Sequence, residues 1–107
     1  MKYINVRDFS KFPGPRYIKL GPYSGEEFRD NHLIPFIQNT DGPFGVDLDG
    51  VIGYGSSFLE EAFGGLVRKG IPTNKIRQIR EHIKSDDDPS LVDEIREYID
   101  DALNADR

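Results

Sequence analysis

The stretch Phe44–Gly70, FGVDLDGVIGYGSSFLEEAFGGLVRKG, organises the rest of the chain. It begins as a short apolar run that contains two aspartates, passes through a glycine-rich turn, and becomes a helical pattern after two serines. The apolar side of that pattern consists of Phe58, Leu59, Ala62, Phe63, Leu66 and Val67. This spacing predicts a helix over about residues 56–69, which Gly70 ends. In such a unit of strand, glycine turn and helix, the loop directs backbone N–H groups and hydroxyls toward one point. We therefore expect the functional site in this loop.

The composition places the chain in the class of small folded proteins. With 107 residues, 36% apolar and 31% charged, residues 1–107 are expected to form one domain. No apolar run approaches the roughly 20 residues of a membrane span, and the first residues lack the apolar core of a signal peptide. The absence of cysteine fits a cytoplasmic protein. The net charge of −5 argues against nonspecific binding of nucleic acid.

The first half of the chain predicts two strands and a helix. Strand-forming residues occur at about 2–7 and again at 17–20, and we expect these two strands to pair. The segment Ser24–Glu27 is a capping box that starts a helix at the residue after the serine. Pro35 is expected to kink or split that helix.

The second half predicts a buried strand and two or three helices. The strand at about 44–49 contains few polar residues apart from its two aspartates, which suits a strand buried on both faces. Over 77–85 two interpretations remain, because the isoleucines have helical spacing but alternate with charged residues as in an edge strand. A last helix is predicted over about 89–104, with Asp88 as its N-cap and a proline at its first position. Taken in order, these elements predict an α/β sandwich with helices covering the sheet.

Three separated motifs in this order carry a family resemblance. VDLDGVIGYGSSFLEEAFGGL, preceded by PGPRY and SGEEFR, resembles a STAS-like family of unknown function found in bacteria and phages. That family is related to the STAS domains of anti-sigma factor antagonists. The resemblance implies an α/β fold with a mixed sheet of about four strands covered by three to four helices, and it makes 77–85 a strand.

The resemblance also implies a site at the start of the helix after the central strand. In the antagonists, a serine there is phosphorylated by a partner ATPase of the histidine-kinase-like type, and the matching position here is Ser57, with Ser56 beside it. Gly55 stands where the antagonists have aspartate, and Phe58 where they have glycine. The implied function is a non-enzymatic protein-interaction module of a signalling system that needs no cofactor or metal.

A phosphate at this position has a physical mechanism. It would face free N–H groups and the positive end of the helix dipole, and it would change the charge of a docking surface by about −2. A simpler interpretation, compatible with the first, is that Ser56 caps the helix and Ser57 fills its first turn. The expected partner-binding surface consists of Gly53, Tyr54, Gly55, Ser56, Ser57, Phe58 and Glu61.

An enzymatic alternative rests on Asp47 and Asp49. The run Asp-Leu-Asp-Gly-Val after an apolar strand imitates the first motif of haloacid-dehalogenase-like phosphatases, where the first aspartate is the nucleophile and carboxylates hold magnesium. That motif normally lies near the start of a much longer chain. The simpler interpretation places both aspartates at a strand end, where they bond loop N–H groups.

A third hypothesis is anion or nucleotide binding by the loop Gly53–Ser57, with Arg16 supplying charge. The loop lacks the lysine of a phosphate-binding P-loop, and positive φ angles would explain its glycines. Arg16 has no local explanation, so we expect it to pair with Asp47 or Asp49 or to contact a partner. His32 and His82 lack ligand spacing and are expected to be surface or packing residues.

Overall fold

The computed structural model describes residues 1–105, and in this part of the chain a three-stranded parallel sheet forms the base of the fold. The strands are β1 (Lys2–Asn5), β2 (Phe44–Asp47) and β3 (Ile83–Lys84), in the order β1-β2-β3. The α/β class is therefore confirmed. The expectation of a mixed sheet with about four strands is wrong for the described residues, because the three strands run parallel.

The central strand β2 is buried along its whole length, as predicted, although it ends at Asp47 rather than at residue 49. Its first residue, Phe44, pairs in register with Lys2 of β1, and Val46 pairs with Ile83 of β3. Parallel sheets occur where helices supply the crossovers and cover the strands. The apolar residues of β2 accordingly belong to the main hydrophobic core.

The predicted strand at 17–20 does not exist. Residues Ile18–Leu20 form a short 3₁₀ helix in a long loop, and Gly21, with φ +154°, ends it. The loop is closed by a 2.8 Å hydrogen bond from the Gly14 N–H to the Tyr23 carbonyl, which pulls this segment away from the sheet. The first strand is also shorter than predicted, because the chain turns into the short helix α1 (Val6–Phe9).

Two composite helices follow, each of which contains one π-helical turn. Their segments are α2 (Gly25–Phe28), a π turn (Arg29–Leu33) and α3 (Ile34–Asn39), and then α4 (Ser56–Leu59), a π turn (Glu60–Gly64) and α5 (Gly65–Arg68). The first helix starts at the predicted cap, where the Ser24 hydroxyl accepts the Glu27 N–H at 3.0 Å. Its chain continues through Pro35, and the π turn directly before that residue absorbs the irregularity.

The segment at 77–85 combines both interpretations of its sequence. The helix α6 (Thr73–Glu81) buries Ile76 and Ile79, as helical spacing predicts. At His82 the backbone leaves the helix with φ −124° and ψ 69°, and the two residues of β3 follow. The expectation of a strand over the whole segment is therefore wrong for most of it.

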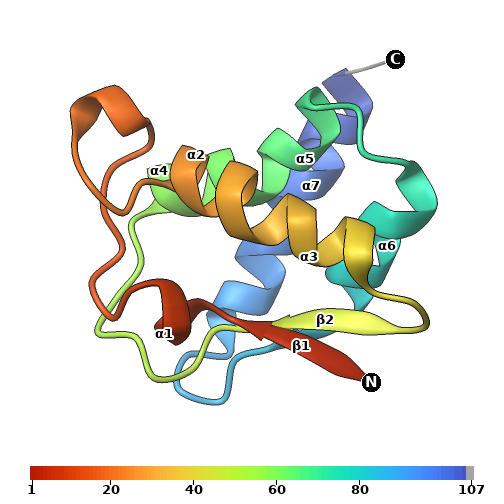
Figure 1. Cartoon of the computed structure of the whole chain (residues 1–107), viewed down its shortest axis with the longest axis horizontal. Coiled ribbons are helices and arrows are strands. Elements are labelled where there is room, and N and C mark those ends of the chain that lie inside the picture. The colour runs from red at the N-terminus through yellow and green to blue at the C-terminus, as the bar shows by residue number, and fades with distance from the viewer. Residues whose placement is uncertain (106–107) are drawn as a thin grey trace.

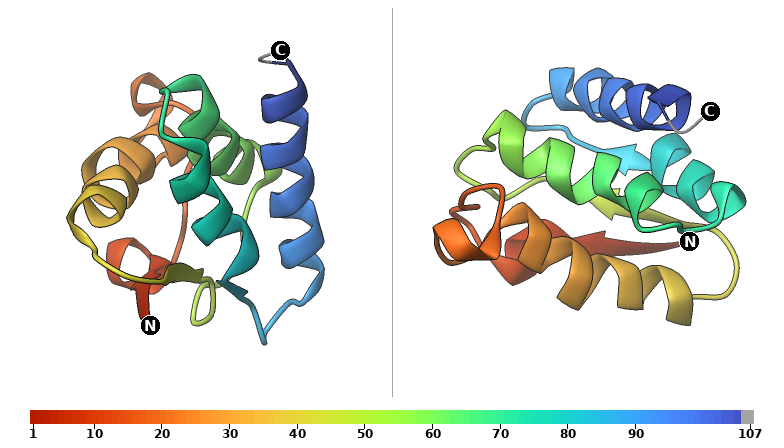
Figure 2. Two further views of the ribbon diagram at one scale, coloured as in Figure 1. Left: turned by 90° about the vertical axis from the view of Figure 1, so that its right-hand side faces the viewer. Right: turned by 90° about the horizontal axis from the view of Figure 1, so that it is seen from above.

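The last helix, α7 (Ser90–Ala105), begins within one residue of its predicted start. The Asp88 carboxylate accepts the Ser90 N–H at 3.2 Å, in keeping with a capping role. The two composite helices run side by side over one face of the sheet, and α6 and α7 continue this layer past β3 (Figure 1; Figure 2). Within residues 1–105, no helix combines the length and the apolar character needed to cross a membrane.

Candidate functional site

The candidate site is the loop between β2 and α4, which leaves the sheet at the carboxyl end of β2. Asp47 Oδ1 accepts the N–H of Asp49 at 2.9 Å, and Asp49 Oδ1 accepts the N–H of Asp87 at 2.9 Å. Asp87 in turn accepts the Gly50 N–H at 3.0 Å. The loops that follow β2 and β3 are thus joined by carboxylates, which is the structural role that the simpler interpretation gave to both aspartates.

Asp47 is also surrounded by cations. Its Oδ2 lies 3.3 Å from Arg7 Nη1 and 3.8 Å from Lys84 Nζ, and the residue is 7% exposed. A nucleophilic carboxylate needs an open side that faces a substrate. Asp47 instead uses its oxygens to hold together α1, the loop and β3, so its geometry favours a structural role over phosphatase chemistry.

Tyr54 anchors the loop from inside. Its hydroxyl donates to the Leu48 carbonyl at 2.8 Å, and its ring packs 6.1 Å from that of Phe58. Burial raises the pKa of the Tyr54 phenol, and the charges of Asp47 and Asp49 act in the same direction. The polar end of Tyr54, which was expected on the binding surface, therefore points inward.

The glycines of the loop fall into two kinds. Gly50 has φ +80°, and a Cβ there would lie 2.8 Å from the Arg7 side chain, so the turn requires glycine. Gly53 and Gly55 do not have positive φ, and a Cβ at either position would meet no atom within 4 Å. The positive φ expected of these glycines holds at Gly50 only. At the other two the fold would accept a side chain, so bare backbone is exposed there without a folding reason.

The two serines differ in their surroundings. Gly55 occupies the N-cap, no side chain caps the helix, and Ser56 is its first residue, so the capping role predicted for Ser56 is wrong. Burial raises the pKa of Tyr98 in α7 to about 12, a hydrogen bond to Glu94 acts in the same direction, and the Ser56 hydroxyl opposes them. Both serines are exposed in the first turn, and Ser56 lies beside Tyr98.

Two residues of the expected binding surface lie in the interior. Phe58 is completely buried and packs 6.0 Å from the ring of Phe28, and Glu61 is 7% exposed. Phe58 in α4 and Glu61 in the following π turn lie on the inner side of the second composite helix and join it to the first, so neither residue is available to a partner in this structure. The prediction failed because helical periodicity assigns Phe58 to the core, and the resemblance alone placed it at the surface.

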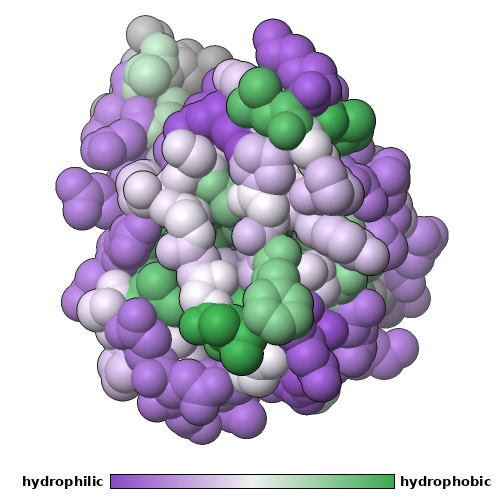
Figure 3. Space-filling view, turned by 90° about the vertical axis from the view of Figure 1, so that its left-hand side faces the viewer, coloured by the Kyte–Doolittle hydropathy of each residue, from purple (hydrophilic) through white to green (hydrophobic). Residues whose placement is uncertain are grey.

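Two exposed apolar residues were missed. Ile52 is 77% exposed and Phe12 is 70% exposed, and the Ile52 N–H donates to the Lys11 carbonyl at 2.9 Å, which joins the two loops. The face that carries these loops shows apolar side chains in separate groups among polar ones (Figure 3). An isoleucine between glycines, outside any helical or strand pattern, is the sequence signal that could have identified this surface.

Arg16 lies away from the loop. Its Nη1 pairs with Glu60 at 2.6 Å and with Glu61 at 3.3 Å, and the hydrogen bond to Glu60 raises its pKa. The predicted pairing with Asp47 or Asp49 is therefore wrong. Next to the loop, Asp87 and Asp88 line a hollow of about 170 Å³, so the local charge favours cations over anions. The geometry gives no support to a phosphate-binding loop.

The two histidines make local contacts. The His82 ring nitrogen Nδ1 lies 2.9 Å from the Gln78 carbonyl, and the His32 ring packs edge-on against Phe9 at 5.0 Å. Both contacts are consistent with packing residues.

Comparison with known proteins gives one match. A family model described as a STAS-like domain of unknown function matches residues 24–90, which include both composite helices, β2, the loop and β3. No curated protein and no solved structure matches the sequence. Since the family model covers more than half of the chain and agrees with the α/β fold, the chain belongs to the STAS-like domain family of unknown function.

Proposed function

We propose that this chain is a non-enzymatic interaction module that binds a signalling protein through the loop Val51–Gly55 and the first turn of α4. The observation that carries the proposal is Ile52, which is 77% exposed directly beside Gly53. Exposing a large aliphatic side chain costs free energy, and exposed apolar side chains beside accessible backbone are typical of docking surfaces. The open backbone at Gly53 and Gly55 would let a partner approach closely.

The family resemblance suggests what the partner is. An ATPase of the histidine-kinase-like type is the partner that the antagonist STAS domains use, and Ser57 is the matching phosphoacceptor position. Ser57 is exposed, and Gly55 and Ser56 precede it without a capping side chain. A phosphate there would add about −2 charges to the first turn of α4, which is part of the proposed surface, without entering the core, so it would alter docking and leave the fold intact.

The proposal is tested by affinity capture from the native host with wild-type protein and with Ile52→Asp. We expect the Ile52→Asp variant to lose the partner that wild type retains. Leu20→Asp is the matched control, because Leu20 is 62% exposed but lies in the separate 3₁₀ turn. If wild type and Ile52→Asp captured the same proteins in equal amounts, the proposed docking surface would be wrong.

The switch is tested on the captured partner. We expect Ser57→Asp to bind at least about tenfold more weakly than Ser57→Ala, because a fixed negative charge imitates the phosphate. Mass spectrometry of the wild-type protein after incubation with ATP and the partner should place a phosphate on Ser57. If the aspartate and alanine variants bind equally, the docking surface can stand but the switch fails.

A further inference from the structure

The outer edge of β1 has unpaired backbone groups. The Lys2 N–H donates to the Pro43 carbonyl at 3.3 Å, and β1 pairs in parallel with β2 from Lys2↔Phe44 to Asn5↔Asp47. In a parallel ladder, alternate residues of a strand direct their N–H and C=O to the same neighbour. Lys2 and Ile4 therefore bond to β2, and Tyr3 and Asn5 direct N–H groups to the other side. Within the described residues no strand lies there.

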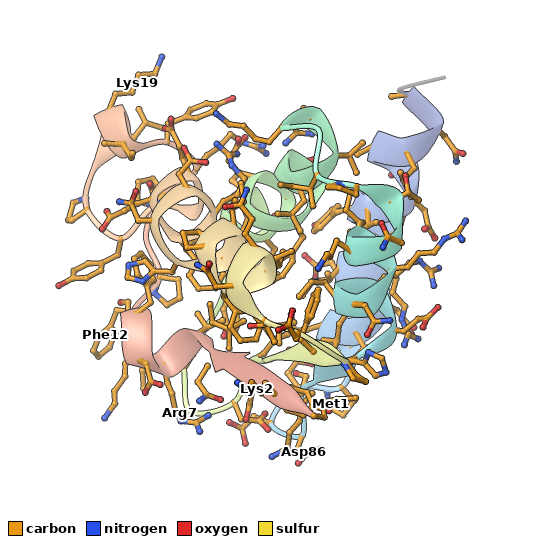
Figure 4. The ribbon with its side chains drawn as sticks, turned by 45° about the vertical axis from the view of Figure 1, so that its right-hand side comes forward. Met1, Lys2, Arg7, Phe12, Lys19 and Asp86 are labelled. Atoms are coloured by element: carbon orange, nitrogen blue, oxygen red, sulfur yellow. The ribbon has the colours of Figure 1, made fainter. Side chains whose placement is uncertain are left out.

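The helix layer extends beyond this edge. Viewed from above, α3 lies on the side of β1 away from β2, so it covers a strip next to the sheet that no strand occupies (Figure 2). The side-chain view shows β1 at the margin of the molecule, with Lys2 at its amino end (Figure 4). We call this strip the vacant strand position.

A groove of about 280 Å³ lies between β1 and the covering helix. Its lining consists of Tyr3, Ile4, Asn5, Asp8, Phe9, Phe28, His32 and Phe36. The aromatic rings form a continuous wall, with Phe9 centred 5.3 Å from Phe28 and 5.0 Å from His32. An apolar wall next to free strand hydrogen-bonding groups matches the site of peptide recognition by strand addition, in which backbone bonds supply affinity and a pocket reads alternate side chains.

We propose that β1 accepts an extended segment of a partner protein as a fourth strand. Side chains alternate along a strand, so a residue opposite Ile4 faces the groove, and its neighbours on either side face away. Ile4 packs against the core on the helix side, so that inward residue is apolar. Asp8 lines the groove, Lys2 lies one residue before its first lining residue, Tyr3, and both charged residues are exposed. An antiparallel segment therefore matches the pattern basic, any, apolar, any, acidic.

A second copy of the chain does not fit this position. Pairing two β1 edges about a two-fold axis would place the two strands about 4.8 Å apart in one continuous sheet. Each copy would also bring its own α3 over the shared edge. Packed helices need about 8–10 Å between their axes, so the two α3 helices would collide. An extended segment without a helix of its own avoids this collision, which favours a partner peptide.

The probe is a short capped peptide in which arginine, phenylalanine and glutamate alternate with threonine, added to ¹⁵N-labelled protein and followed by NMR. We expect the Tyr3 and Asn5 amides to show the largest shifts and slower hydrogen exchange. The Lys2 and Ile4 amides already face β2 and should gain little protection. The same peptide with serine in place of phenylalanine should bind at least about tenfold more weakly, because the groove stays unfilled.

Tyr3→Pro supplies the matching change in the protein. It removes an outward N–H and leaves the bonds of β1 to β2 in place, so we expect about fivefold to tenfold weaker binding. If Tyr3→Pro disturbs the native spectrum, a peptide N-methylated at the residue opposite Tyr3 removes the reciprocal bond, from the peptide N–H to the Tyr3 carbonyl, and should weaken binding by a similar factor. Leu20→Ser, in the 3₁₀ turn, should bind as wild type. The proposal would be overturned if the peptide did not bind, or if the largest shifts centred on Ile52. It would also be overturned if the proline variant and the N-methylated peptide kept full affinity, or if the protein dimerised through the Tyr3 amide. None of these readouts depends on Ser57 or Ile52.

Discussion

Arg29 Nη1 donates both to the carboxylate of Glu61 and, at 3.1 Å, to the backbone carbonyl of the same residue. Both residues belong to π-helical turns, one in each composite helix. A π turn widens a helix and weakens its own hydrogen-bond ladder, and the guanidinium supplies a donor to one carbonyl of that turn. Gly65 makes room for it, since a Cβ there would lie 2.5 Å from Arg29 Nη1. The two irregular turns therefore meet at one buried ion pair.

This pair is predicted to be sensitive to the loss of one partner. Arg29 and Glu61 are only 3% and 7% exposed. Arg29→Met leaves the Glu61 carboxylate in the interior with only its longer contacts to Arg16 and Arg68, at 3.3 Å and 3.5 Å, and should lower the free energy of unfolding by about 3 kcal/mol. Adding Glu61→Leu should recover part of that loss, because both charges are then gone. Arg80→Met, which breaks the exposed pair with Asp100, should cost at most about 1 kcal/mol. Urea unfolding measures all three; a cost for Arg29→Met no greater than for Arg80→Met would contradict the buried role.

The sequence predicted those elements whose signal is local. The capping box at Ser24, the apolar run of β2 and the helical spacing after Ser56 each act through near neighbours, and the corresponding elements are present. The strand at 17–20 failed because a short apolar run becomes a strand only if a neighbour can pair with it. Here the Gly14–Tyr23 hydrogen bond closes the loop away from β1.

The loop after β2 was predictable from the sequence, but the directions of the side chains around it were not. The glycines and serines after β2 marked the loop, yet the direction of each side chain depended on packing that the sequence does not encode locally. Arg16, for example, paired with Glu60, forty-four residues away. Ile52 became exposed because Tyr54 anchors the loop from its other side. Such long-range contacts are invisible to periodicity.

The glycines yield a second prediction, since close packing requires some of them and not others. A Cβ at Gly25 would lie 2.5 Å from the Phe58 carbonyl, where α2 crosses α4, so Gly25→Ala should cost about 1–3 kcal/mol. Gly53→Ala meets no atom and should change the free energy of unfolding by at most about 0.5 kcal/mol. Thermal and urea unfolding of both variants compares them. A large loss for Gly53→Ala would mean that the loop needs glycine for folding, which would weaken the case for its docking role.

Acid should weaken the fold through Glu60. The hydrogen bond from Arg68 holds the pKa of Glu60 below its ordinary value of 4.5, and the bond from Arg16 acts in the same direction. A carboxyl whose pKa is lower in the folded state stabilises the fold above its unfolded pKa, and this stabilisation is lost as the pH falls through the folded pKa. Urea midpoints measured from neutral pH down to below pH 4.5 should therefore fall less steeply in Glu60→Gln than in wild type. Asp86→Asn is the control, because this carboxylate is 79% exposed; an equal slope in wild type and Glu60→Gln would contradict the assignment.

Alkali should weaken the fold through Tyr54. Burial raises the pKa of this phenol above its ordinary value of 10.0, so its protonated form is favoured in the folded state. The pH dependence of stability is therefore opposite to that of Glu60. The stabilisation is complete below the unfolded pKa of about 10, and it is lost as the pH rises through the folded pKa. Tyr54→Phe should therefore flatten the fall in stability above about pH 10, and it should cost about 1 kcal/mol at neutral pH because the bond to the Leu48 carbonyl is lost. Tyr23→Phe, at a residue 48% exposed, should leave the alkaline limb unchanged. The ultraviolet absorbance of tyrosinate, followed together with unfolding, distinguishes the two variants. If Tyr54 ionised at the same pH as the exposed tyrosines, the loop would not be anchored from inside.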